Sequence, residues 1–244
     1  MKIIYCDGIF DLFHVGHLRH LEQIRALFDE PIELIVGVVS DMIAAGYKRV
    51  PIMNEQHRLS ILQACIYVDR AFITDVLVMD EAFLHTHNID YVVHAFTEAD
   101  KEKQREFFRI PIELGKFIEM DYNIGISTSQ IINEYSLMQS DIQESPLDHC
   151  RTKCEIAPTD RVLVVGQYIG DIGTKQCICL DTNQSRAAQD MVHAQYPIIC
   201  FAHDIRIFKP AYFDYIVLSN QEYEADNLHD ELKRVFNGRI IIAT

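Results

Sequence analysis

Two hydrophobic patterns alternate along the first 135 residues of the chain. Short, nearly continuous apolar runs, of which 32–40 (IELIVGVVS) is the clearest, are typical of buried parallel strands. The segments between them carry apolar residues three and four positions apart, which indicates amphipathic helices. The predicted strands are residues 3–5, 32–40, 70–73, 91–94 and 116–119, and the predicted helices are 15–28, 54–65, 80–87, 100–108 and one that begins near 127. This alternation predicts a doubly wound α/β fold, a parallel sheet with its site at the carboxyl ends of the strands.

The apolar periodicity stops over residues 136–159, where Ser, Pro, Asp and Gln accumulate, so this segment is predicted to be a linker. A second, smaller set of apolar runs follows the linker. These runs cover residues 161–166, 177–181, 198–204, 214–219 and 239–243. The sequence therefore predicts a first α/β domain over 1–135 and a second, smaller Rossmann-like α/β domain over 160–244.

Composition narrows the choice of partners. The 244 residues are 49% apolar and carry a formal net charge of −14, which argues against a general binder of nucleic acid or of anionic membranes. No apolar stretch is long enough to insert across a bilayer, and the first ten residues are too polar for a signal peptide. The seven cysteines lack the spacing of a disulfide framework and fit reduced thiols, so we expect a cytoplasmic protein. No metal site of side chains is expected, because His149, Cys150 and Cys154 form one cluster and zinc requires four ligands.

The segment YCDGIFDLFHVGHLRHL (5–21) carries the clearest chemistry. It is predicted to be a strand, a short turn that contains glycine, and the start of a helix. His14 and His17 are three positions apart, so on a helix they project to the same side, and Gly16 between them lets a ligand approach the backbone. A helix start also supplies free N–H groups, which suit a phosphate. The alternative is that the two histidines only cap or pack the helix.

This segment resembles the nucleotide-binding signature of the cytidylyltransferases, the HxGH branch of the nucleotidyltransferases. The matching residues are Asp7, Gly8, Phe10, Asp11, Leu12, Phe13 and His14. The resemblance extends through IVGVVSD (35–41), GYKRVPIMNEQHR (46–58), YVD (67–69) and GISTSQII (125–132), the last of which resembles the second signature of the family, RTEGIST. It covers residues 1–135, slightly over half of the chain.

The resemblance implies nucleotidyl transfer. A phosphate oxygen of a phosphomonoester would attack the α-phosphorus of CTP in line, and pyrophosphate would leave. By resemblance, His14 and His17 would contact the CTP phosphates, and Lys48 would bridge the α-phosphate and the incoming substrate. Ser127 and Thr128 would hold the β,γ end, and Mg²⁺ would assist. The other nucleotide-binding positions that the resemblance implies are Gly8, Ile9, Phe10, Asp11, Gly16, Gly125 and Ile126.

On the substrate side, the resemblance implies Asp7 and His94, with Asp7 as the candidate for the cationic head of phosphocholine or phosphoethanolamine. The product would be a CDP-alcohol used in phospholipid synthesis. The residues do not decide between choline and ethanolamine. A homodimer is expected, because members of the family usually dimerise.

Two positions depart from the family pattern. Ala95 and Phe96 stand where the family has adjacent aspartates, and Tyr122 stands at the arginine of RTEGIST. An arginine contact to phosphate typically contributes about 1.5–3 kcal/mol, so weaker CTP binding is expected unless another cation, such as Arg105 or Arg109, replaces it. An alternative therefore stays open: a diverged nucleotide-binding protein with little turnover, or a transferase of altered nucleotide specificity.

The second predicted domain repeats neither signature. Its acidic strand ends, Asp181 and Asp204, resemble faintly those of class I S-adenosylmethionine-dependent methyltransferases. The glycines after its first strand, Gly166, Gly170 and Gly173, do not have GxGxG spacing. A structural or dimer-forming domain is therefore favoured over a methyl-donor site, and both hypotheses stay open.

Overall fold

The computed structural model describes residues 1–98, 100–122, 128–129, 161–165, 177–180, 198–200, 207–210, 212–218 and 236–242. The chain divides into two compact units, the first made from most of residues 1–125 and the second from residues 126–244 together with residues 12–15 and 64–66. The predicted linker, 136–159, lies outside the described residues, so the predicted domain limits stay a prediction. No helix in the described ranges is long and apolar enough to cross a membrane.

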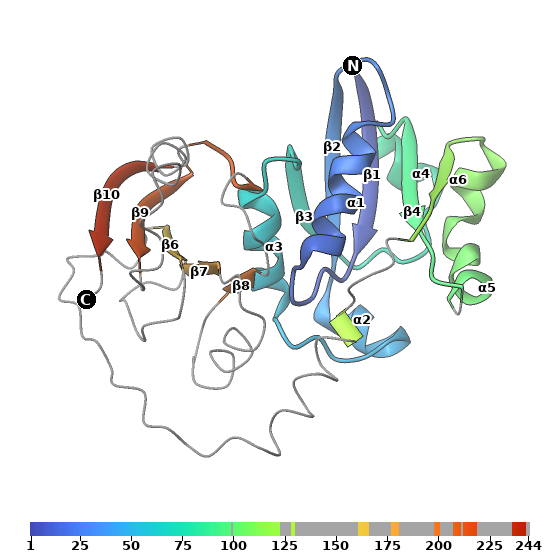
Figure 1. The fold of residues 1–244 in the computed structure, drawn as a ribbon. Helices are drawn as coiled ribbons and strands as arrows, with labels where there is room; N and C mark the ends of the chain where they lie inside the picture. The colour runs from blue at the N-terminus through green and yellow to red at the C-terminus, as the bar shows by residue number, and fades with distance from the viewer. Residues whose placement is uncertain are drawn as a thin grey trace. The chain divides into compact units, whose positions relative to one another are not determined.

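The first unit is a five-stranded parallel sheet in the order β3-β2-β1-β4-β5 (Figure 1). Its strands are β1 (Lys2–Gly8), β2 (Ile32–Val39), β3 (Arg70–Thr74), β4 (Tyr91–Ala95) and β5 (Phe117–Met120). Its helices are α1 (Val15–Arg25), α2 (Asp41–Tyr47), α3 (Glu55–Ala64), α4 (Glu81–Thr86), α5 (Lys101–Gln104), the 3₁₀ helix η1 (Arg105–Phe108) and α6 (Arg109–Glu113). The doubly wound α/β fold predicted from the apolar runs is confirmed.

The two faces of this sheet are covered by different helices. On one face Tyr5 of β1 lies in a buried apolar cluster with Leu84 of α4 and Phe108 of η1, and α6 packs against the cluster. Figure 1 shows α1 crossing in front of β1 and β2. The packing around Tyr5 also explains a glycine in β2: a Cβ on Gly37 would lie 2.0 Å from the Tyr5 hydroxyl oxygen.

The structure corrects the predicted elements in two places. Residues 41–47 form α2, a helix that is absent from the predicted elements; the hydroxyl of Ser40 caps it by accepting a hydrogen bond from the Ile43 amide at 3.4 Å. The predicted helix over 100–108 is divided into α5 and η1, and helical structure continues through α6. Pro111 is compatible with α6 because it stands in the first turn, where the missing N–H has no partner in the helix.

The second unit contains a five-stranded parallel sheet in the order β10-β9-β6-β7-β8. The strands are β6 (Val162–Val165), β7 (Cys177–Leu180), β8 (Ile198–Cys200), β9 (Phe213–Leu218) and β10 (Phe236–Ile242). The five predicted strands are confirmed where the structure describes them, and β10 begins earlier than predicted. The residues behind the methyltransferase resemblance, Gly166, Gly170, Gly173, Asp181 and Asp204, lie outside the described residues.

Candidate active site

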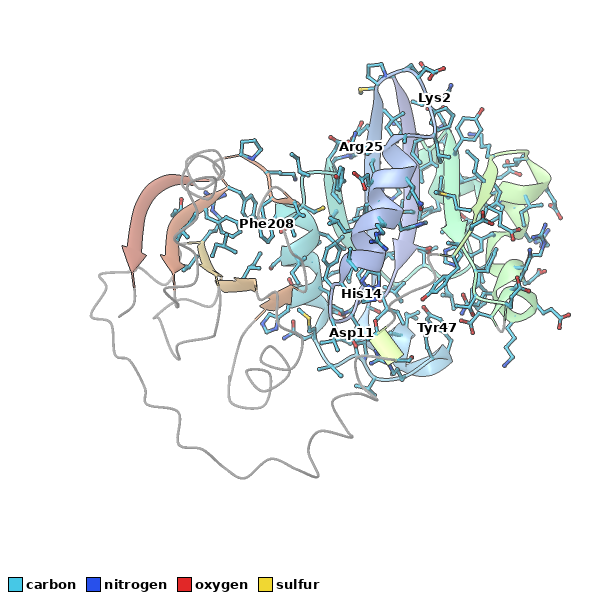
Figure 2. The ribbon with its side chains drawn as sticks, viewed as in Figure 1. Lys2, Asp11, His14, Arg25, Tyr47 and Phe208 are labelled. Carbon is cyan, nitrogen blue, oxygen red and sulfur yellow. The ribbon has the colours of Figure 1, made fainter. Side chains whose placement is uncertain are left out.

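The carboxyl ends of the strands of the first sheet, called the carboxyl edge below, collect buried polar side chains. Asp7 near the end of β1 is 8% exposed, and Asp11 and His14 in the turn that follows are 2% and 3% exposed. Figure 2 shows Asp11, His14 and Tyr47 at this end of the strands, with Lys2 and Arg25 at the other end. Buried polar groups require partners, so the contacts of this edge determine what it can bind.

The turn between β1 and α1 has an unusual backbone. Phe10 (φ 53°) and Leu12 (φ 47°) both adopt the left-handed conformation, which costs a non-glycine residue about 1–2 kcal/mol. Both side chains are buried, and the Phe10 ring lies edge-on to the His17 ring, with 5.3 Å between the ring centroids. Surrounding contacts must therefore hold this turn in its shape.

Asp11 supplies the main contact of the turn. Its Oδ1 accepts a hydrogen bond from the Met53 amide at 2.9 Å, and its Oδ2 accepts one from the Ile52 amide at 2.9 Å. Its Oδ2 also lies 2.8 Å from Nη1 of Arg49, and the Asp11 side chain is 1% exposed. Both carboxylate oxygens are thus bound by the segment 49–53. Asp11 ties this segment to the first signature.

Arg58 strengthens the same connection. Its side chain is fully buried; Nε donates to the Met53 carbonyl at 3.0 Å, Nη1 donates to the Ile9 carbonyl, and Nη2 lies 2.6 Å from Oδ1 of Asp41. Asp41 and Glu55 in turn accept hydrogen bonds from each other's amides, at 3.2 and 2.8 Å. The starts of α2 and α3 and the first turn are therefore joined through one guanidinium.

Lys48 lies between the segments that these contacts join, but its side chain takes no part in the contacts. It caps the C-terminus of α2 through its amide, which donates to the Ala44 carbonyl at 3.0 Å. Its side chain is exposed and forms no ion pair or hydrogen bond with any residue in the described ranges. The backbone of Lys48 is thus positioned between Asp41 and the segment that Asp11 holds, while its ammonium group remains available to a ligand.

The two signature histidines differ in their surroundings. His14 precedes the first residue of α1 and is buried, and this burial lowers its pKa to about 4. His17 lies in the first turn of α1 and is half-buried. His14 is therefore neutral near pH 7, and one of its two ring nitrogens carries a proton.

Asp7 and His94 meet across neighbouring strands. The Oδ1 of Asp7 lies 3.4 Å from Nδ1 of His94, and the His94 ring packs against the rings of Phe96 and Phe108, with centroids 4.7 and 4.5 Å away. β1 and β4 are the strands between which the sheet order reverses, the usual position of a ligand in doubly wound folds. The structure thus brings together the two residues implied on the substrate side. Phe96 is 7% exposed and belongs to the apolar core.

Sequence reasoning missed Tyr47 and Arg49, the two neighbours of Lys48. Burial, followed by the negative charges of Asp7 and Asp100, raises the pKa of Tyr47 to about 12. The only signal for these residues in the sequence was their position beside the predicted lysine.

The two arginines considered as replacements for the cation missing at Tyr122 are bound elsewhere. Nη1 of Arg105 donates to Glu119 at 3.0 Å, and Arg109 pairs with Glu106 and Glu113 at 3.1 and 3.0 Å. Both side chains are about half exposed. They form surface ion pairs in the structure, and this does not favour either one as the replacement for the missing cation.

Part of the predicted site cannot be placed. Gly125, Ile126 and Ser127 lie outside the described residues, and Thr128 is helical. Within the ranges that the structure does describe, no group of three or more His, Cys, Asp or Glu side chains could hold a metal ion.

Comparison with known proteins gives a consistent result. The model of the cytidylyltransferase-like family matches residues 5–134. The chain is 35% identical over 129 residues to a probable choline-phosphate cytidylyltransferase of Schizosaccharomyces pombe, and 39% identical over 129 residues to choline-phosphate cytidylyltransferase A of Homo sapiens. Each match covers 53% of this chain and 35% of the relative. An ethanolamine-phosphate cytidylyltransferase of Dictyostelium discoideum is 36% identical over 135 residues, 54% of this chain and 37% of that protein. The chain thus spans about a third of the length of these relatives.

Proposed function

Because this chain belongs to the cytidylyltransferase-like family, we propose that it transfers CMP from CTP to a phosphorylated amino alcohol, releasing pyrophosphate. The names of its relatives support phosphocholine and phosphoethanolamine as the class of acceptor. The structural observation that carries the proposal is the contact of Asp11 with the Ile52 and Met53 amides, because it holds the Lys48 segment against the first signature. We further propose that the protein is cytoplasmic, forms a homodimer and supplies CDP-alcohols for phospholipid synthesis.

The proposed transfer requires positioning and charge neutralisation, and no covalent intermediate with the protein. His14, neutral and buried, would donate a hydrogen bond to a CTP phosphate, and His17 would contact the phosphates from the first turn of α1. The Lys48 ammonium would lie between the α-phosphate and the acceptor phosphate. Since its backbone is already held, little reorganisation is required when negative charge accumulates in the transition state.

The acceptor would bind through its cationic end. The Asp7 carboxylate is nearly buried beside His94, and a carboxylate in such a site attracts a cation more strongly than one in water. Asp7 precedes the first signature turn directly, so an ammonium group held there would leave the acceptor phosphate close to the nucleotide site.

Mg²⁺ is proposed to bind with the triphosphate of CTP, which is how this ion commonly enters nucleotide sites. Two described carboxylates of the carboxyl edge are already bound by protein groups: Asp11 by two amides and Arg49, and Asp41 by Arg58 and the Glu55 amide. When bound, the ion would neutralise charge on the phosphate oxygens.

A second candidate is a nucleotide-binding protein with little turnover. Tyr122 favours it, because no cation stands at that position of the second signature.

Pyrophosphate release decides between the two candidates. It should be measured with Mg²⁺, each of CTP, ATP, UTP and GTP, and each of phosphocholine, phosphoethanolamine and glycerol-3-phosphate. Turnover that requires CTP and one amino-alcohol phosphate, and that is abolished by His17→Ala but retained by the surface variant Arg109→Gln, supports the transferase. If folded protein binds CTP but releases no pyrophosphate with any of these combinations, the result supports the second candidate, a nucleotide-binding protein with little turnover.

A further inference from the structure

Arg49 follows Lys48 at the carboxyl edge and has a guanidinium group that the protein uses on one side only. We propose that Arg49 is a phosphate-binding residue that contacts CTP through the open side of its guanidinium. The inference rests on the nucleotide site proposed above. It assigns to Arg49 the charge that Tyr122 does not supply.

The contacts that the described residues make with the Arg49 side chain all involve Nη1. Nη1 lies 2.8 Å from Oδ2 of Asp11 and donates to the Val50 carbonyl at 3.1 Å. Nε and Nη2 donate to no residue in the described part of the chain, and the side chain is 30% exposed. The N–H groups of Nε and Nη2 are parallel, and this pair binds phosphate oxygens in a bidentate manner.

Asp11 determines where this open side is held. Its carboxylate is 1% exposed and is fixed by the Ile52 and Met53 amides, and it stands three residues before His14 in the first signature. The pair with Asp11 therefore keeps the Arg49 guanidinium at the turn instead of in solvent. A side chain that is already ordered loses less conformational entropy when a ligand binds.

Binding of an anionic triphosphate at this site requires a second positive group beside Lys48. The chain has a net charge of −14, so an anionic triphosphate must be held by local positive groups. Arg58 cannot contribute, because it is fully buried and its nitrogens donate to Met53, Ile9 and Asp41. Lys48 supplies a single ammonium, so the neighbouring guanidinium is the group best placed to complete the contact.

A structural role is the competing explanation, because Arg49 also neutralises the buried Asp11 carboxylate. Substitution by lysine separates the two roles. Lysine preserves a positive charge for Asp11 but removes the bidentate fork, whereas glutamine removes both the charge and the fork. Tyr122→Arg would return a cation to the second signature while leaving position 49 unaltered.

The experiment is calorimetric titration of the full chain with Mg²⁺ and CTP, together with a thermal melt of every variant. Loss of a charge-assisted bidentate contact should weaken CTP binding by about 10- to 100-fold in Arg49→Gln and by a smaller factor in Arg49→Lys. Adding Tyr122→Arg to Arg49→Gln should recover most of the affinity. The control Arg109→Gln should stay within about twofold of the unaltered chain, because its ion pairs are exposed.

Several outcomes would overturn the inference. The first is an unchanged CTP affinity of folded Arg49→Gln. If that variant does not fold, an unchanged CTP affinity of Arg49→Lys has the same meaning. Failure of Tyr122→Arg to raise the affinity of the weakened variant would leave Arg49 a structural residue. If the unaltered chain binds CTP but releases no pyrophosphate, the proposed transfer is refuted, and the CTP affinities of the variants still decide the role of Arg49. If the unaltered chain does not bind CTP, both the proposed transfer and the role of Arg49 are refuted.

Discussion

The two ends of the first sheet use similar hydrogen bonds and ion pairs but differ in what they leave open. At the amino ends of the strands, called the amino edge, charged side chains bind backbone groups and each other. At the carboxyl edge, the same kinds of contact hold a loop in which the ammonium group of Lys48 and one side of the Arg49 guanidinium have no partner among the described residues. Polar contacts alone therefore do not mark a site in this fold. A site is marked by hydrogen-bond donors that the protein positions but does not pair with its own acceptors.

Arg25 at the end of α1 is the centre of the amino edge. Its Nε donates to the Tyr67 carbonyl at 2.7 Å and its Nη1 donates to the Ile32 carbonyl at 2.9 Å. It also pairs with Asp69, whose Oδ2 accepts from the Leu34 amide at 2.7 Å. The motif YVD, noted for its resemblance to the family, is thus part of a clamp that fixes α1 to β2 and to the start of β3.

The largest expected effect is that of Arg58→Met at the carboxyl edge. The methionine fills much of the space, but the Met53 and Ile9 carbonyls lose their donor, and each buried acceptor left without a partner typically costs about 1–3 kcal/mol. The loss of the pair with Asp41, which is 40% exposed, adds a smaller cost. Chemical denaturation should show this loss. Hydrogen exchange should place the first opening at residues 9 and 41–55, since these are the segments that Arg58 joins. An unchanged free energy of unfolding would contradict the role given to Arg58.

Lys48→Ala should separate activity from stability. The Lys48 side chain has no partner in the described ranges, so the melting temperature should hardly change. Loss of a positioned charge from a transition state typically lowers kcat by about 100- to 1,000-fold. Pyrophosphate release under saturating substrates measures this effect. Retention of full turnover would remove Lys48 from the proposed mechanism.

Acid should lower the stability of the protein through two histidines, His14 at the carboxyl edge and His20 in α1. Burial lowers the pKa of His14 to about 4, and burial together with His94 lowers the pKa of His20 to about 4. Below pH 6.5 the unfolded chain binds these two protons, whereas the folded chain resists them, so the free energy of unfolding falls as the pH drops from about 6.5 to 4. Each pKa unit corresponds to about 1.4 kcal/mol per histidine.

Denaturation between pH 7 and pH 4 checks this expectation. His20→Leu should flatten the slope, because one of the two titrating groups is removed. The same slope in His20→Leu and in the unaltered chain would show that His20 does not cause the effect.

The smallest effects are expected at the amino edge. Arg25→Met should lower stability by about 1–3 kcal/mol, because Arg25 is partly exposed and water can replace some of its contacts, while turnover at permissive temperature stays the same. The matched control is Arg70→Gln, which removes an exposed pair with Glu33 and should cost less than about 1 kcal/mol. A fall in kcat for Arg25→Met in folded protein would contradict the comparison of the two edges.

Much of the fold was predictable, because burial on both faces leaves parallel strands as recognisable apolar runs. The runs 32–40 and 91–94 and the segment 5–21 predicted the sheet and the end of it that carries the chemistry. α2 was not predictable, since seven residues that contain Gly46 have little helical tendency alone. It is stabilised by the Ser40 cap and by the contacts of Asp41 with Glu55 and Arg58, which lie 14 and 17 positions away.

The sequence by itself determined the strand and helix alternation and the residues that resemble the family signatures, because these are properties of neighbouring positions. Only the tertiary structure decided the state of individual side chains. It buried Asp11 and Arg58 as links between segments more than 40 positions apart, and it left Lys48 and one side of Arg49 open. Whether a charged group is bound by the protein itself or remains available to a ligand depends on contacts between such distant segments. The local pattern of a sequence carries little information about these contacts.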